Sequence, residues 1–179
     1  MRLFVGIPLA AAAIEDLSAI SMRLQSKADG LRWSAPESWH ITLQFLGNTL
    51  EYDCIVARLR GVRATRVPIT LEGVGFFDRA GIFFAGVSLT PELGELQKSV
   101  AAATAQCGFI PETRPYHPHI TLARTKGKKL QGLRELKAKI HREPRFSPFV
   151  AEEFVLYESL AGTGGSQYQI RDRFPVEPK

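Results

Sequence analysis

The spacing of apolar residues alternates along this chain between strand-like and helix-like patterns. The first apolar run, Leu3–Ile7, predicts a buried strand. Pro8 ends the run, and a helix with one apolar face follows, its buried positions three or four residues apart at Ala13, Leu17, Ile20 and Leu24. The same segment also has the composition of a secretory signal, from Arg2 to about Ala12. We favour the strand and helix, because Pro8 interrupts the apolar region and the helical spacing continues beyond Ala12.

The same two patterns continue to the end of the chain. Further strands are predicted at Leu31–Trp33, Trp39–Leu46, Val67–Gly75, Gly81–Leu89, Tyr116–Arg124, Pro148–Tyr157 and Tyr168–Phe174. Further helices are predicted at Tyr52–Gly61, after the start signal Thr90-Pro91-Glu92, and at Leu130–Ile140. A hairpin turn is predicted at Asp78–Gly81, and no linker-like stretch divides the chain. We therefore expect one α+β domain over residues 1–179, built of two interlocked lobes.

Composition narrows the class of protein. The 179 residues are 45% apolar and 23% charged, which is typical of a globular domain, and no apolar run is long enough to span a membrane. The formal net charge of +5 favours a polyanionic partner. The two cysteines, Cys54 and Cys107, lie in predicted amphipathic helices, so we expect free buried thiols and a reducing, cytoplasmic location.

One internal repeat carries the chemistry. The tetrapeptide His40-Ile41-Thr42-Leu43 recurs as His119-Ile120-Thr121-Leu122, so two of the four histidines stand in the same context. Each copy lies in a predicted strand, where side chains alternate between two faces. The polar face of the first copy carries His40, Thr42 and Gln44. The opposite face, which is expected to pack in the core, carries Ile41, Leu43 and Phe45.

A pair of such strands around a pseudo-twofold axis would place two imidazoles across one cleft. Displacement at phosphorus needs one group to take a proton from the attacking oxygen and another to protonate the leaving oxygen. Imidazole suits both tasks because its ordinary pKa is near neutrality. The threonine hydroxyls could hold phosphate oxygens, and the nearest cations are Arg124 and the loop Lys126–Lys129. Strict alternation places Arg124 on the face opposite His119, so it reaches the phosphate only if the strand ends, bulges or twists there.

The motif segments WHITLQFLG and PYHPHITLARTKG resemble the two HxTx signatures of the 2H phosphoesterase superfamily, and within it the RNA 2',3'-cyclic phosphodiesterases, also called 2'-5' RNA ligases. The opening RLFVGIPL, the RW before the first motif, and the closing LYESL and GSQY are similar to that family's ends. The resemblance thus spans nearly the whole chain. It implies a bilobal α+β fold with two antiparallel sheets lining a central cleft and helices outside.

The resemblance also implies an activity. It is the metal-independent hydrolysis of a 2',3'-cyclic phosphodiester at an RNA end to a 2'-phosphomonoester, with 2'-5' ligation as the reverse reaction. His40 would be the proton donor to the leaving 3'-oxygen, and His119 the proton acceptor that activates water. Thr42, Thr121 and Arg124 would bind the phosphate. The implied partner is an RNA with a cyclic end, such as a tRNA fragment, bound by a monomer without cofactor, metal or membrane.

Two other functions remain open from the residues. The first changes only the substrate, to a cyclic mononucleotide, an ADP-ribose cyclic phosphate or 2'-5' oligoadenylate. The second is a non-catalytic module that binds RNA ends, which two complete motifs disfavour. A zinc site made by His117, His119 and a cysteine lacks any supporting spacing. We expect His117 to pack or to position a neighbour, and His141 to lie on the surface at a helix end.

Aromatic residues near the motifs are candidates for stacking on a terminal base. They are Trp33, Trp39, Phe45, Phe76, Phe77 and Tyr116, of which Phe45 is expected in the core. The segment Gly162–Ser166 is predicted as a loop that either approaches a ligand closely or is simply a solvated hairpin connection.

Overall fold

Two four-stranded antiparallel sheets form the centre of the molecule, with helices at both ends. The computed structural model describes residues 1–127, 130–140, 144–162 and 165–177. The strand order of the first sheet is β10 (Gly165–Pro175), β9 (Glu153–Gly162), β1 (Arg2–Pro8) and β3 (His40–Asn48). The order of the second is β2 (Leu31–Trp33), β7 (His119–Thr125), β6 (Ile82–Val87) and β5 (Leu71–Phe77). The expected α+β fold with two antiparallel sheets is confirmed.

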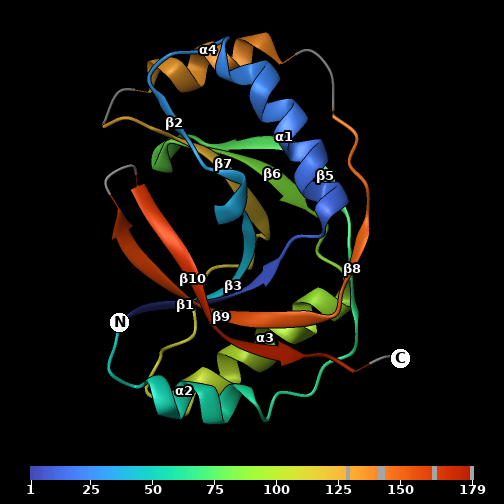
Figure 1. Cartoon of the computed structure of the whole chain (residues 1–179), viewed down its shortest axis with the longest axis vertical. Coiled ribbons are helices and arrows are strands. Elements are labelled where there is room, and N and C mark those ends of the chain that lie inside the picture. The colour runs from blue at the N-terminus through green and yellow to red at the C-terminus, as the bar shows by residue number, and fades with distance from the viewer. Residues whose placement is uncertain (128–129, 141–143, 163–164, 178–179) are drawn as a thin grey trace.

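The helices lie outside the sheets. Helices α1 (Ala11–Gln25) and α4 (Gln131–Lys139) lie beside the β2–β7–β6–β5 sheet, and α2 (Tyr52–Leu59) and α3 (Pro91–Ala105) lie beneath the other sheet (Figure 1). The chain passes between the sheets repeatedly, since β1 and β3 belong to one sheet and β2, between them in sequence, belongs to the other. Consecutive segments therefore build both halves together.

For most elements, the ends predicted from the hydrophobic pattern lie within a few residues of those in the structure. The four buried positions expected for the first helix are all buried in α1. Thr90 caps α3 as expected, because its Oγ1 accepts a hydrogen bond from the Leu93 amide at 3.2 Å. The predicted turn is a short 3₁₀ segment, Asp78–Ala80, closed by Gly81 at a φ of 63°. Periodicity thus identified the elements that bury one face each.

The structure corrects two predicted strands. The segment expected as one strand, Val67–Gly75, is divided between β4 (Val67–Ile69) and β5, which pair with different partners. The segment expected at Pro148–Tyr157 is likewise divided, into β8 (Phe149–Ala151), which pairs with β4, and β9. Alternation of buried and exposed residues continues from β4 into β5, so the pattern shows no boundary there.

Several strands also begin or end at residues other than those predicted. Strand β7 begins at His119, because Pro118 has no amide hydrogen to donate to a ladder. Strands β9 and β10 extend to Gly162 and from Gly165, so most of the predicted Gly162–Ser166 loop is the end of a hairpin. Residues 163 and 164, like Lys128, Lys129 and His141, lie outside the described residues.

The two cysteines form a disulfide, and the expectation of free thiols is wrong. Cys54 in α2 is bonded to Cys107, two residues beyond α3, with the two Cα atoms 6.0 Å apart. Both cysteines are half-buried, because the apolar faces of α2 and α3 pack against each other. Helical spacing shows which face of each helix is apolar but not which other face it meets. The cysteines therefore give no support for a reducing compartment.

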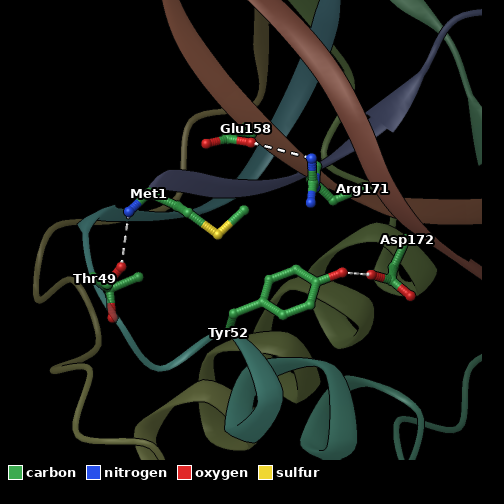
Figure 2. Close-up of polar contacts among 6 residues, drawn as sticks. All are labelled: Met1, Thr49, Tyr52, Glu158, Arg171 and Asp172. Carbon is green, nitrogen blue, oxygen red and sulfur yellow. Dashed lines mark hydrogen bonds and ion pairs between the residues drawn. The ribbon is translucent and has the colours of Figure 1, made fainter.

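Polar contacts attach α2 to the last strand. The Tyr52 hydroxyl donates a hydrogen bond to Asp172 on β10, and the adjacent Arg171 lies 3.5 Å from Glu158 (Figure 2). The bond to Asp172 raises the pKa of Tyr52 above its usual value. The Met1 amine donates to the Thr49 carbonyl at 3.0 Å, so the start of β1 is held close to the end of β3. None of the described helices combines the length and apolarity needed to cross a lipid bilayer.

Candidate active site

Each motif strand contains a bulge immediately after the histidine and threonine. Along β3, Val5 of β1 pairs with Gln44 and the next residue, Gly6, pairs with Thr42, so Leu43 is an extra residue. Along β7, the same shift between Phe83 and Phe84 of β6 makes Leu122 the extra residue. A bulge reverses the alternation of side chains beyond it. Two consecutive buried residues follow the threonine in both strands, and the sixth residue of each returns to the face of the histidine.

Because of the bulges, the predictions for Gln44 and Phe45 are wrong, and the condition set for Arg124 is met. Gln44 was expected beside His40, but it is buried with 6% of its surface exposed. Phe45 was expected in the core, but it is 56% exposed and lines the same cleft as His40. Arg124 reaches the face of His119 through the bulge at Leu122, which is one of the three conditions named for it.

A single cleft of about 300 Å³ contains both motifs. The residues expected to act there all line it: His40, Thr42, His119, Thr121 and Arg124. Its other lining residues come from β1, the segment before β3, β3 itself and the β9–β10 hairpin: Arg2, Phe4, Ser34, Ser38, Phe45, Ser159, Ser166 and Tyr168. Ser159 lies in the LYESL segment, and Ser166 and Tyr168 lie in GSQY. The family resemblance of these segments was the signal in the sequence for Ser159 and Tyr168, and the glycine-rich segment Gly162–Ser166 was a second signal for Ser166.

His40 is held in one orientation and one tautomer. Its Nδ1 lies 2.7 Å from the Ser38 carbonyl oxygen, which only accepts hydrogen bonds, so Nδ1 carries the proton. The other ring nitrogen, Nε2, lies 3.1 Å from Thr42 Oγ1. The imidazole packs among aromatic rings, with centroid distances of 4.6 Å to Phe4 and 5.1 Å to Tyr168. The neutral ring therefore has its lone pair on Nε2, next to the motif threonine.

His119 has the same arrangement in the other half. Its Nδ1 lies 2.8 Å from the His117 carbonyl oxygen, so its Nε2 is also the unprotonated nitrogen of the neutral ring. The ring meets Phe77 and Phe84 edge-on, at 5.0 and 5.4 Å between centroids. His117 itself packs against the same two phenylalanines. This is the packing and positioning place that the sequence predicted for it.

Burial in these aromatic surroundings lowers the pKa of both histidines. For His40 the pKa falls from 6.5 to about 4, because desolvation outweighs the favourable bond to Ser38, and the charges of His119 and Arg124 lower it further. The pKa of His119 is also lowered, first by burial and then by His117 and Arg124. Both rings are therefore neutral at pH 7. A bound anion would raise both pKa values, because it favours the imidazolium form.

The backbone around the first motif is fixed from both sides. The Tyr116 hydroxyl donates a hydrogen bond to the Thr42 carbonyl at 2.9 Å, and burial raises the pKa of Tyr116 so that it stays protonated. On β1, Gly6 lies against the motif so closely that a Cβ there would be 2.8 Å from the Ile41 carbonyl oxygen. Through the Tyr116 hydroxyl, the segment that precedes His119 also holds the strand that contains His40.

The cations are distributed unevenly around the cleft. Arg124 lies directly across from Arg32 of β2 in the antiparallel ladder, so their side chains share a face. Arg2 also lines the cleft, with its guanidinium over the Phe45 ring, 5.4 Å from the ring centroid. Lys126 is exposed but does not line the cleft. Within the described ranges, no three His, Cys, Asp or Glu side chains gather as metal ligands, and both cysteines are joined to each other.

Comparison with known proteins decides the family. The family model of the 2'-5' RNA ligase superfamily matches residues 8–163, which include both motifs and most of the cleft. This chain belongs to the 2'-5' RNA ligase superfamily. An RNA 2',3'-cyclic phosphodiesterase of Aquifex aeolicus is 30% identical over 97% of this chain and 96% of its own length. One of Archaeoglobus fulgidus is 30% identical over 94% of this chain and 97% of its own length.

A solved structure of the superfamily agrees with the fold. Escherichia coli LigT, in its apo form, superposes with a TM-score of 0.81 at 25% identity, covering 98% of this chain and 97% of LigT. LigT has also been solved with 3'-AMP, with the same TM-score and coverage. The two-sheet architecture of this chain is therefore that of the superfamily.

Proposed function

We propose that this protein hydrolyses the 2',3'-cyclic phosphate at an RNA end to a 2'-phosphomonoester. The observation that carries the proposal is the pair of imidazoles in one cleft, each with Nδ1 bonded to a backbone carbonyl and each accompanied by a motif threonine. The curated relatives of matching length named above are RNA 2',3'-cyclic phosphodiesterases, and LigT accepts a nucleotide, 3'-AMP. We take residues 1–179 as one domain, with the cleft between two interlocked lobes.

The proposed reaction is an in-line displacement at phosphorus. The Nε2 atom of His119 takes a proton from water as the water oxygen attacks, and the phosphorus–O3' bond breaks. The Nε2 atom of His40, in its protonated form, gives its proton to the leaving O3'. The product retains the phosphate on O2', and the two rings regain their starting states by exchanging protons with solvent. A 5'-hydroxyl in place of water would give a 2'-5' linkage by the same transfers.

The remaining motif residues are proposed to bind the phosphate. The hydroxyls of Thr42 and Thr121 and the guanidinium of Arg124 line the cleft beside the imidazoles. Donors fixed before substrate arrives stabilise charge that develops on the non-bridging oxygens in the transition state. The bound phosphate in turn raises the low pKa of His40, so that the ring can hold the proton that it donates.

The test is incubation with an RNA oligonucleotide that carries a 2',3'-cyclic phosphate, with products compared to synthetic 2'- and 3'-phosphate standards. We expect only the 2'-phosphate, at a rate unaffected by EDTA. His40→Ala and His119→Ala should each reduce kcat by on the order of 10²- to 10⁴-fold, with circular dichroism confirming that the variants fold. A 3'-phosphate product, or full activity in either variant, would contradict the mechanism. Retained RNA binding without turnover in the wild type would instead indicate a binding module.

A further inference from the structure

Two arginines lie opposite each other on the cleft side of the β2–β7 strand pair. Arg32 of β2 pairs with Arg124 of β7, so their Cα atoms lie about 4.5–5.5 Å apart and both side chains leave the sheet on one face. That face is the cleft side, because Arg124 lines the cleft. The residues on either side of Arg32, Leu31 and Trp33, pack in the core instead. A second guanidinium thus lies beside the one that we propose for the reacting phosphate.

The chain that follows Arg32 forms part of the cleft wall. The Ser34 amide donates a hydrogen bond to the Leu122 carbonyl at 2.8 Å, so this segment continues alongside the second motif beyond the end of β2. Ser34 lines the cleft, and it lies two residues after Arg32, on the same face of an extended chain. Arg32 is therefore at the rim of the cleft, on the side of Arg124.

No carboxylate neutralises either arginine. Both side chains are exposed, and in the part of the chain that the structure describes neither has an ion pair. Like charges directly opposite on neighbouring strands destabilise a sheet, and an anion bound between two guanidiniums replaces that repulsion with attraction. Arg2 differs from them, because its guanidinium already lies over the Phe45 ring. The Arg32–Arg124 pair is thus the place at the cleft where a second negative group gains most.

We propose that Arg32 binds the phosphate on the 5' oxygen of the ribose that carries the cyclic phosphate. The inference rests on the proposed function and narrows its substrate. In an RNA, the 5' oxygen of the terminal ribose bears the phosphodiester to the preceding nucleotide, so one ribose separates two phosphates. Arg124 and Arg32, side by side on neighbouring strands, take one phosphate each. The site therefore favours an RNA end, or another substrate with a 5'-phosphorylated ribose, over a nucleoside 2',3'-cyclic phosphate that has no second phosphate.

The test uses three substrates that differ only at the 5' oxygen. Adenosine 2',3'-cyclic phosphate has no phosphate there, its 5'-phosphorylated form has one, and a dinucleotide with the same 3' end has a phosphodiester. In the wild type, KM should be lower for the second and third substrates by about 3- to 30-fold, the range of one charge-assisted contact at a partly exposed site. Arg32→Gln should remove this advantage and leave KM for the first substrate unchanged. Arg32→Lys, which keeps the charge, should retain part of it.

The matched control removes the same charge elsewhere. Arg23 of α1 is also an exposed arginine, but it does not line the cleft, so Arg23→Gln should have the KM of the wild type for all three substrates. Added salt should raise KM for the dinucleotide less steeply in Arg32→Gln than in the wild type, because one phosphate contact is gone. An equal rise in KM for all three substrates in Arg32→Gln would place Arg32 at the reacting phosphate and overturn the inference. An unchanged KM for the two substrates with a 5' phosphate would overturn it as well.

A binding measurement separates this inference from the proposed function. Calorimetry with adenosine 2'-monophosphate and with adenosine 2',5'-bisphosphate needs no turnover. The wild type should bind the bisphosphate more tightly, whereas Arg32→Gln should bind the two ligands alike. If this difference is found in a protein that does not hydrolyse cyclic ends, the proposed function is wrong and the second phosphate site stands. Equal affinity of the wild type for both ligands would overturn the site even if the enzyme hydrolyses cyclic ends.

Discussion

His40 and His119 are followed by the same three residues in the sequence but have different surroundings in the fold. Phe4, Tyr157 and Tyr168 surround the first ring, whereas Phe77 and Phe84 pack on the second. Aromatic contacts on both rings remove water and so lower both pKa values. Each imidazole keeps the same tautomer through a carbonyl two residues earlier in the chain. Both imidazoles are thus neutral bases at pH 7.

Anion binding should therefore be visible in the titration of His40. In the free protein we expect a pKa of about 4, and addition of saturating inorganic phosphate should raise it, because the negative charge stabilises the imidazolium. Two-dimensional NMR of the imidazole resonances, with and without phosphate, gives the pKa directly. His119→Gln, which removes one neighbouring positive charge, is the control and should raise the pKa of His40 slightly. A pKa of His40 near 6.5 in the free protein would show that burial does not control it.

The lowered pKa of His40 also predicts how the free energy of unfolding depends on pH. Because the pKa of His40 is lower in the folded protein than in the unfolded chain, the unfolded chain binds more protons between pH 4 and 6.5. The free energy of unfolding should fall as the pH is lowered through that window, with His40 contributing up to about 3 kcal/mol. Urea denaturation at several pH values measures this slope. His40→Gln should have a shallower slope, and an unchanged slope would exclude His40 as its source.

At the scale of elements, the bulges in β3 and β7 place Phe45 and Arg124 in the cleft. A regular strand would direct both side chains into the core, where the sequence pattern placed Phe45. The bulge at Leu43 lies beside Gly6 of β1, which pairs with Thr42 and leaves no room for a Cβ next to the Ile41 carbonyl. Residue 6 therefore needs to lack a side chain for the ladder to keep its register.

Gly6→Ala should damage both stability and activity. Its Cβ would lie 2.8 Å from the Ile41 carbonyl oxygen, between His40 and Thr42, and backbone cannot move aside cheaply. We expect the free energy of unfolding to fall by roughly 1–3 kcal/mol and kcat/KM to fall with it. Gly94→Ala in α3 is the matched control, because its Cβ would meet Leu89 at an ordinary 3.7 Å. That control should gain up to about 1 kcal/mol of stability from helix propensity. Wild-type stability and activity in Gly6→Ala would contradict the close approach.

At the scale of the whole molecule, the disulfide and the polar contacts of α2 join segments that are distant in sequence. Cys54–Cys107 closes a separation of 53 residues, and Tyr52 binds Asp172 near the other end of the chain. Helix α3 also reaches the first motif, where Gln97 Nε2 donates to the Leu43 carbonyl at 3.5 Å. The α2–α3 layer thus supports the strand that carries His40.

Loss of the disulfide should lower stability more than activity. A cross-link over a loop of this length restricts the unfolded chain, so the variant Cys54→Ala/Cys107→Ala should lose about 2–4 kcal/mol of unfolding free energy. Denaturant unfolding with and without a thiol reductant measures the effect. Reductant should destabilise the wild type to the level of the double variant and leave the double variant unchanged. A wild type insensitive to a reductant that has demonstrably cleaved the bond would contradict this role.

The sequence by itself determined the helices, most strands and the histidine–threonine pairs, because each depends on residues close together in the chain. The period of apolar residues reports which face of an element is buried, and the repeated tetrapeptide predicts the pair of side chains that we propose as acid and base. The tertiary structure alone decided the bulges, the division of Val67–Gly75 and the disulfide. Each of these depends on the partner strand or helix that a segment meets. The bulge in β3 cannot be predicted from apolar spacing, because the residue it turns into the core, Gln44, is polar. Phe45 is therefore a core residue in the sequence pattern and a residue of the cleft in the folded protein.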